Sequence, residues 1–563
     1  MSLVAMLWEL IAMRELFRDS TFGHVVRLVT RGRVLQFEEE SNPSLWERYV
    51  DREKSGRMAH HGHVGEEEKG PSKETEGNYH DGRQSEQRQT NAEDNRVSSD
   101  TRTESNEQQR NAASGAAVDP EKGRDVTVVT WYGEHDPEHP LNWSTPKKVF
   151  VAFLICFLTT SVYIGSSIYS AGTVGVMEQF GVSQVAAMLG LCLFVAGYGL
   201  GPMVWAPASE IPQIGRNPVY IGTLVVFVFF QFGVIYAKNF GMLLAFRFLT
   251  GFFGSPVLAT GGASLGDIYR PSTRAYAIAI WGMAAVSGPV LGPLGLFGNS
   301  SGSPVSVSLY LLPETSSANI LYRRSRRLRK LTGRNDLKCE PEIQSEQMTG
   351  KDITLMVLIR PFSLTFTEPI LFLLNLYIAL IYGLLYIWFE SFAIVFIEVY
   401  GFNLGEEGLS FLGIFIGALV FNENGELKPE KRLPPAFVGA FCIPICLFWF
   451  GWTSQPQIHW IVPIIGSSFF STGAFLLFNS VLNYLGDAYP DHAASVFAGN
   501  DFLHSSFGAG FPLFANAMYR RLGTVWASSL LGFLSIAFIP IPFVLYFYGE
   551  RIRKASKRAR HDL

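Results

Sequence analysis

The sequence predicts an all-α polytopic membrane protein, and three observations lead to this class. Of the 563 residues, 48% are hydrophobic and only 17% are charged, which is unlike an ordinary soluble domain. Apolar segments of roughly 20 residues, the length that crosses a bilayer as a helix, recur along the chain after residue 148. Charged residues are concentrated in residues 1–147 and in the short gaps between the apolar segments.

Ten of these segments are long and apolar enough to be predicted as membrane-spanning helices. Two further apolar segments, 305–312 and 409–421, would form helices of about 12 and 20 Å, too short for a hydrocarbon core of roughly 30 Å. The ten predicted spans cover residues 149–170, 186–206, 219–237, 241–263, 276–297, 370–398, 436–453, 458–484, 494–518 and 524–548.

Basic residues in the gaps predict how the helices are oriented. Arg216, Arg270 and Arg274 lie in alternate gaps, and the long gap 313–368 carries a cluster of arginines. Basic gaps are retained in the cytoplasm, so we expect these gaps and both termini to be cytoplasmic. Five spans before the long gap would place it outside. Two shortened spans, around 298–312 and 409–421, restore twelve spans in two six-helix halves.

The fourth span carries a charge well inside an apolar stretch. At 100° per residue, Arg247 shares a face with Gly251, Gly254 and Gly261, which lets another helix approach closely. A charge at this depth normally faces the interior of a bundle or a water-filled cavity. We expect Arg247 to lie on a polar path through the protein. The alternative is an arginine that extends toward the membrane surface from a helix used for packing only.

Four local motifs occur in order along the apolar region. They begin at Ser209-Glu-Ile-Pro-Gln-Ile-Gly-Arg-Asn-Pro, at Arg247, at Ser287-Gly-Pro-Val-Leu-Gly-Pro and at Pro313-Glu-Thr-Ser-Ser-Ala-Asn. With twelve spans in two halves, these motifs resemble the second-to-third helix loop, the fourth and fifth helices and the central loop of the major facilitator superfamily. Within it, the chain is similar to the fungal drug:proton antiporters with twelve spans.

The chain departs from that family at two places. Residues 298–308 stand where the family has a full sixth helix, and the eighth helix is cut short after Val420. The flanking sequence is intact, which indicates missing coding segments and not an evolved ten-span protein. The resemblance implies five regions: a largely disordered cytoplasmic tail (1–135), a first transmembrane half (136–312), a basic cytoplasmic loop (313–368), a second half (369–548) and a basic cytoplasmic tail (549–563).

Two groups of residues are expected to govern the conformational change. Glu210, Gly215 and Arg216 lie in a tight loop that, in the resembling family, pairs charges against a helix end; Asp267 is the expected partner. Gly288-Pro289 and Gly292-Pro293 lie one helical turn apart, where each proline removes a helix hydrogen bond and each glycine admits a neighbour. A solvated loop and a purely structural kink are the alternatives.

A third group is expected to form the path for substrate and protons. Tyr382, Tyr386 and Glu390 share one helix face, and aromatic rings there could stack on a planar or cationic ligand. Asp501 follows Asn500 and is spaced i, i+3 from His504, so the two ionisable groups can pair. The alternatives are a carboxylate at the outer mouth that faces water and a structural hydrogen-bonded pair.

The resemblance implies a secondary transporter that exports amphipathic organic compounds in exchange for protons. The expected partners are the lipid bilayer, a small organic substrate and protons, with the chain acting as a monomer in the plasma membrane. We expect no enzymatic activity, cofactor, metal or nucleic-acid partner: the spans show no metal-spaced ligands or nucleophile elbow, and no phosphate-binding loop suggests ATP as the energy source. A polyamine or nutrient porter and a non-transporting truncated protein are the alternatives.

Overall fold

A computed structural model describes residues 14–47, 49, 116–118, 125–291, 311–402, 429–489, 492–556 and 559. The described residues fall into two compact units. The larger unit consists of the residues up to Leu35, residues 135–320 and residues 345–563. It contains all the long apolar helices among the described residues. The other is small and is drawn from residues 36–134 and 321–344.

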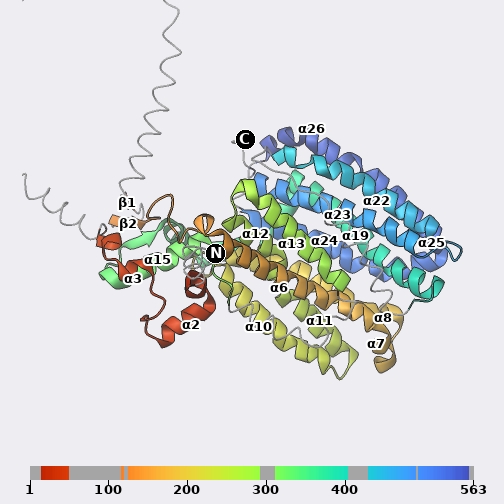
Figure 1. Cartoon of the computed structure of the whole chain (residues 1–563), viewed down its shortest axis with the longest axis horizontal. Coiled ribbons are helices and arrows are strands. Elements are labelled where there is room, and N and C mark those ends of the chain that lie inside the picture. Colours follow the sequence, from red (N-terminus) through yellow and green to blue (C-terminus); the bar gives the residue numbers. More distant parts are fainter. Residues whose placement is uncertain are drawn as a thin grey trace, which may run out of the picture. The chain divides into compact units, whose positions relative to one another are not determined.

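In the first half of the apolar region, two spans are each made of two consecutive helices. Gly201 and Ser255, at the junctions, keep right-handed helical angles, and each is followed by a proline. Proline lacks the N–H that would continue the hydrogen-bond ladder, so the span is interrupted without turning back. The helices are α6 (Thr145–Ala171), α7 (Thr173–Phe180), α8 (Gln184–Leu200), α9 (Pro202–Glu210), α10 (Arg216–Ile235), α11 (Phe240–Gly254), α12 (Pro256–Ile268) and α13 (Pro271–Leu291), as Figure 1 shows.

Irregular turns also occur within the helices of the second half. A π-helical turn over Ala393–Val399 extends its first helix, and Gly523, with φ of 73°, interrupts α25. That interruption agrees with the boundary predicted between spans 494–518 and 524–548. The helices are α19 (Pro369–Phe392), α22 (Pro434–Thr453), α23 (Ile461–Ala488), α24 (Ala493–Gly510), α25 (Pro512–Phe538) and α26 (Pro540–Ala555).

Eight helical segments in the described part of the chain are long and apolar enough to cross a membrane. They correspond to eight of the ten predicted spans. The other two predicted spans, 276–297 and 494–518, coincide largely with α13 and with α24 and the start of α25. The two shortened spans, around 298–312 and 409–421, lie outside the described residues except for residues 311 and 312.

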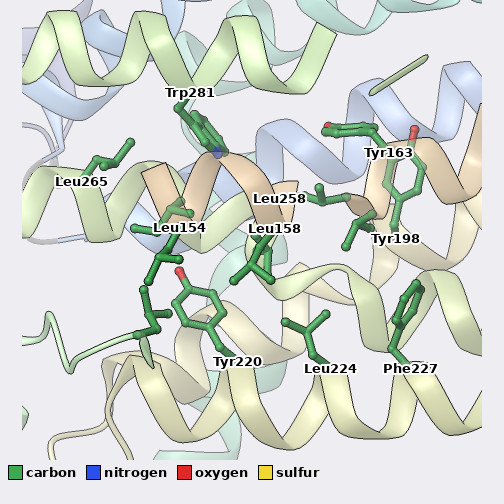
Figure 2. Packing of buried hydrophobic residues seen from close by; sticks show 14 of the residues in the cluster. Leu154, Leu158, Tyr163, Tyr198, Tyr220, Leu224, Phe227, Leu258, Leu265 and Trp281 are labelled. Atoms are coloured by element: carbon green, nitrogen blue, oxygen red, sulfur yellow. The ribbon is translucent and has the colours of Figure 1, made fainter. Parts of the chain in front are cut away.

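Large apolar side chains from several helices form the core of the first half. Leu154 and Leu158 of α6 lie among residues of α10 and α12, including Leu224 and Leu258, in one buried cluster (Figure 2). Large apolar side chains also lie on the outer surface of the helices, where Phe229 of α10 is 67% exposed. An apolar outer surface of this kind suits contact with lipid chains and not with water.

The small unit contains a three-stranded sheet that the sequence analysis did not predict. Strands β1 (Ala116–Val118) and β2 (Asp125–Val129) pair antiparallel, and β2 pairs parallel with β3 (Leu337–Cys339). Residues of the N-terminal tail are therefore hydrogen-bonded to residues of the central loop. The remaining elements of the tail and loop are helices α2 (Thr21–Val29), α3 (Glu38–Ser41), α15 (Ser317–Thr332), α16 (Glu340–Glu346), α17 (Gly350–Leu358) and α18 (Arg360–Thr367). Short 3-10 turns at Pro140–Asn142 and Pro429–Arg432 precede α6 and α22.

We expected residues 1–135 to be largely disordered. Most of that tail, namely residues 1–13, 48, 50–115 and 119–124, lies outside the described residues. Its described parts form helices and strands because they carry apolar side chains that can be buried, such as Phe37 and Val129.

Candidate functional site

A large cavity lies between the two halves of the apolar region. It encloses about 1120 Å³ of space free of atoms, its opening included, and α6, α12 and α13 of the first half and α19, α23 and α24 of the second contribute to its walls. Most of the wall is aromatic or aliphatic, and Asp501 is the one carboxylate among its described lining residues. The aromatic lining residues are Tyr163, Trp281, Tyr382, Tyr386, Phe470, Phe475, Phe478 and Phe497.

Tyrosine hydroxyls connect the two halves beside this cavity. The Tyr198 hydroxyl, from α8, lies 2.9 Å from the Tyr382 hydroxyl and 3.2 Å from the Tyr386 hydroxyl, both from α19. The Tyr163 ring packs edge-on against Tyr198 at 5.8 Å between centroids, and Figure 2 shows the two side chains close together. Tyr382 and Tyr386 thus line the cavity, as their shared helix face suggested.

A buried polar network occupies the α24 side of the cavity. His504 Nε2 lies 3.1 Å from Asp501 Oδ1, which confirms the predicted i, i+3 contact. His504 Nδ1 lies 3.3 Å from Asn500 Oδ1, and Asn500 Nδ2 donates to Asn375 Oδ1 at 3.0 Å. The second oxygen of Asp501, Oδ2, is buried without a hydrogen-bond partner among the described residues. A carboxylate and an imidazole therefore share a buried site in the wall of the cavity.

The His504 ring is also held by aromatic contacts. It packs edge-on against Tyr382, with centroids 4.5 Å apart, and against Phe478 at 5.8 Å. These contacts place the polar network beside the aromatic residues of the cavity wall. Glu390 lies in α19, but its side chain is outside the described residues, so its predicted place on the path stays a prediction.

Arg247 lies deep in the first half, where it is 3% exposed. Its Nε donates to the Gly190 carbonyl at 3.1 Å and its Nη1 to the Gly165 carbonyl at 2.9 Å. The guanidinium packs on the rings of Tyr169 and Phe194, 4.6 and 4.4 Å from their centroids. The side chain points into the bundle and does not extend to the surface, but it is not among the lining residues of the cavity described above.

A second group of charges gathers at one end of the helices, which we call the Arg216 end. Arg216, at the start of α10, donates through Nε to Asp267 Oδ2 at 2.6 Å and through Nη2 to Oδ1 at 3.3 Å. This is the predicted pair, in the two-pronged geometry that only an arginine provides. Ser209 Oγ accepts a further bond from Arg216 Nη1 at 3.3 Å.

Glu314 completes this end, although the sequence analysis gave it no role. Its carboxylate accepts the backbone N–H groups of Arg216 and Asn217, at 3.0 and 3.2 Å, where the first turn of α10 has no intrahelical acceptor. Asn319 Nδ2 donates to the Pro212 carbonyl at 2.7 Å. The segment that begins the central loop therefore holds the loop between α9 and α10.

Gly215 is required by this close approach. Its φ of 78° is unfavourable for other residues, and an added Cβ would lie 2.6 Å from Asn319 Cγ and 2.7 Å from Glu314 Oε2. Position 215 therefore requires glycine both for its positive φ and for the lack of space for a side chain.

Two contacts join the halves at the Arg216 end. Glu210 Oε2 accepts from Ser495 Oγ of α24 at 3.4 Å. Asp487 of α23 is bonded by Arg274 from the first half and by Arg432, at 3.1 Å, from the second. The halves are closed against one another here.

The fifth-helix motif lies at the limit of the described residues. An added Cβ on Gly288 would lie 2.3 Å from Tyr163 Cβ, so α13 and α6 approach closely at that glycine, as predicted. Gly292 and Pro293, and the Pro289 side chain, are outside the described residues, and the predicted bend there stays a prediction.

The fold and the site together define a class of protein. Two helical halves meet around a cavity in a bundle of membrane-spanning helices, and contacts between charged and polar side chains close one end, as expected of a membrane transporter. The family model of the Major Facilitator Superfamily matches residues 155–511, and the chain belongs to that family.

Curated relatives resemble most of the chain. It is 43% identical over 478 residues to the Multidrug transporter FLR1 of Candida glabrata, covering 78% of this chain and 84% of that protein. It is 39% identical over 463 residues to Fluconazole resistance protein 1 of Saccharomyces cerevisiae, covering 76% of this chain and 84% of that protein. Among solved structures, the proton:xylose symporter XylE bound to 6-bromo-6-deoxy-D-glucose has a TM-score of 0.50 at 14% identity, covering 72% of this chain and 96% of that one, which supports the fold.

Proposed function

We propose that this protein exports amphipathic organic compounds from fungal cells in exchange for protons, by alternating access. Membership of the superfamily and similarity to fungal proteins named for multidrug transport and fluconazole resistance support drug efflux. The observation that carries the proposal is the aromatic cavity between the halves with one buried carboxylate–imidazole pair in its wall.

The cavity suits a substrate that is largely apolar and carries a polar or cationic group. Rings such as Tyr386 and Phe478 offer faces for stacking, which requires no fixed substrate shape. Asp501 offers a carboxylate to a cation at the same wall. These features favour a range of drugs or toxins over one specific nutrient.

The arrangement of the two halves, which is closed at the Arg216 end, corresponds to one state of the transport cycle. In alternating access, the Asp487 and Glu210 contacts between the halves must break for the cavity to open at this end. We place the Arg216 end in the cytoplasm on the basic residues of its loops, with both termini cytoplasmic and the plasma membrane as the location. A tag near Gly333 that is accessible from outside intact cells would contradict this orientation.

Asp501 and His504 are the proposed groups through which proton binding acts on substrate binding, with Glu390 as the second candidate carboxylate. Proton-coupled exchange requires an ionisable group whose protonation alters the affinity for substrate. Asp501 has its Oδ1 paired with His504 and its Oδ2 buried, so a change of its protonation alters the charge in the cavity wall beside Tyr382.

The test uses the purified full chain in proteoliposomes, with a fluorescent organic cation and an imposed pH gradient. Asp501→Asn and Glu390→Gln should each be compared with Asp352→Asn, an exposed helix-capping residue outside the cavity. We expect the variant at the coupling site to keep substrate exchange without a gradient and to lose gradient-driven accumulation. If both variants accumulate substrate like the control, the coupling assignment is wrong. If the unaltered chain neither binds nor exchanges any tested compound, the non-transporting alternative holds.

A further inference from the structure

Helix α2 presents an apolar face that no described residue covers. Phe22, Val25, Leu28 and Val29 are 48%, 53%, 82% and 76% exposed. At 100° per residue these four fall within one arc of about 120°, while Gly23 and Arg27 fall on the opposite side. Four large apolar side chains on one short helix form a continuous patch, and such a patch marks a contact surface.

The opposite side of α2 is already occupied. Gly23 is buried so closely that an added Cβ would lie 1.9 Å from the Phe17 carbonyl oxygen. Arg27 Nη1 donates to the Leu35 carbonyl at 2.6 Å, which holds the following turn against the helix. The chain on either side of α2 therefore covers this side of the helix, and the exposed apolar patch lies on the uncovered side.

Contacts at the start of α2 set its level along the membrane-spanning helices. Asp19 lies 2.6 Å from Lys147 Nζ, in the first turn of α6, and the Thr21 hydroxyl accepts from Asn217 Nδ2, in the first turn of α10, at 3.1 Å. Ser20 also forms a β-bridge with Pro313. Both α6 and α10 are membrane spans, and Figure 1 shows α2 beside the start of α10. The helix therefore lies where those spans leave the hydrocarbon core.

Basic residues flank the patch. Arg14 precedes α2, and Arg31 and Arg33 follow it, all three exposed. Arginines at this level attract anionic lipid headgroups, and an amphipathic helix with an apolar face binds best in the headgroup region.

We propose that α2 lies in the headgroup region of the leaflet at the Arg216 end, with Phe22, Val25, Leu28 and Val29 against acyl chains and Arg31 and Arg33 on anionic headgroups. The occupant of the patch is lipid and not a second protein, because the anchors on α6 and α10 hold the patch at membrane level, where any partner would have to displace lipid. The proposal is independent of substrate, proton coupling and direction of transport.

The test uses the full chain with its five cysteines replaced by serine, reconstituted in phosphatidylcholine vesicles with and without phosphatidylserine. Single cysteines carry an environment-sensitive fluorophore: Val25→Cys and Leu28→Cys in the patch, Phe229→Cys on the outer face of α10 and Lys351→Cys in an exposed turn of α17. Labels at 25 and 28 should resemble the label at 229, with blue-shifted emission and quenching by brominated lipid. The label at 351 should be quenched by aqueous iodide.

The proposal is overturned if the labels at 25 and 28 behave like the label at 351 in vesicles. This includes the case in which they become protected only in native membranes, since that would identify a protein partner. Arg31→Gln with Arg33→Gln should reduce the lipid quenching at 28 in vesicles that contain phosphatidylserine and leave it unchanged in pure phosphatidylcholine. Equal quenching in both vesicle types would overturn the part of the proposal that concerns anionic lipid. The label at 229 reports in every sample whether the variant is inserted.

Discussion

The hydroxyl oxygens of Tyr198 and Tyr382 lie 2.9 Å apart and belong to helices α8 and α19 of different halves. Tyr382 also packs on His504, the partner of Asp501. A single residue therefore joins the contact between the halves to the wall of the cavity and to its ionisable pair. A rocking motion that separates α8 from α19 must break the first contact, and it will disturb the second.

The first prediction concerns this contact. Tyr382→Phe removes a hydrogen bond worth about 1 kcal/mol net, so the population of the arrangement described above should fall by roughly fivefold relative to its alternative. Distances between spin labels on the two halves would measure that shift. The matched control is Tyr377→Phe in the same helix, because Tyr377 is buried in the core of the second half. An identical distance distribution in both variants would show that the hydroxyl contact does not link the halves.

The second prediction compares two glycines with positive φ. Gly333→Ala, at φ of 70° with no described residue within 4 Å of the added Cβ, should cost about 1–2 kcal/mol of local stability and leave transport intact. Gly215→Ala carries the same backbone cost and also displaces Glu314 or Asn319. We therefore expect Gly215→Ala to lower both thermal stability and transport. Equal effects of the two variants, measured by thermal unfolding in detergent and by substrate efflux, would contradict the proposed role of Glu314.

The third prediction concerns the small unit formed by tail and loop. Arg327 Nη2 lies 2.7 Å from Glu39 Oε1, and Arg324 Nε lies 3.6 Å from the same atom, with the side chains of Arg324 and Glu39 each 1% exposed. Glu39→Gln leaves buried cationic charge without its anion, which typically costs about 3–5 kcal/mol. Hydrogen exchange in β2 and β3 should therefore become faster. Glu47→Gln, at an exposed position in the same tail segment, should not change it.

The helical organisation and much of the site could be predicted from the sequence because both follow local rules. Apolar length identifies spans, and i, i+3 and i, i+4 spacing identified the Asp501–His504 pair and the Tyr382–Tyr386 face. The Arg216–Asp267 pair is separated by 51 residues and came from a family resemblance.

The remainder depends on contacts between distant segments, for which local spacing gives no signal. Glu314 lies 98 residues from Arg216, and Tyr198 lies 184 residues from Tyr382. The strand Val126-Thr-Val-Val129 has the β-branched residues typical of a strand, which was a usable signal. Its partner β3, however, lies more than 200 residues away in the central loop.

The fourth prediction concerns pH at the anchor of α2. Burial alone would raise the pKa of Asp19, but Lys147 and Arg18 outweigh burial and hold that pKa well below its ordinary value. A carboxyl whose pKa is lowered on folding stabilises the fold above its ordinary pKa, and this contribution is lost as pH falls through the lowered value. The fluorescence of a label at Val25→Cys should therefore be constant from pH 8 to pH 5. Asp19→Asn should change it at every pH, because Lys147 then loses its anionic partner. A transition between pH 5 and 8 that disappears in Asp19→Asn would show that the anchor titrates in this range.

The last prediction concerns Arg247, which the sequence placed either on a polar path or extending toward the membrane surface. Its burial excludes the second position. Two of its nitrogens donate to the carbonyls of Gly190 and Gly165, on α8 and α6, so the guanidinium joins three helices. Lysine has one donor group in place of the planar fork and cannot reach both carbonyls in the same way. Arg247→Lys should therefore weaken the packing of α6, α8 and α11, and Arg247→Ala should weaken it further, because the buried carbonyls then lose their donors at about 1–3 kcal/mol each.

Transport measurements distinguish this structural role from a place on the polar path. If Arg247 acts on the path, Arg247→Ala should insert and unfold like the unaltered chain and yet fail to transport. If it acts through packing, the loss of transport should follow the loss of thermal stability, with Arg247→Lys between the two. Nη2 of Arg247 has no hydrogen-bond partner among the described residues, which supports the first outcome, since a buried donor of this kind can bind a further group when the helices move. Full transport and full stability in Arg247→Ala would exclude both roles.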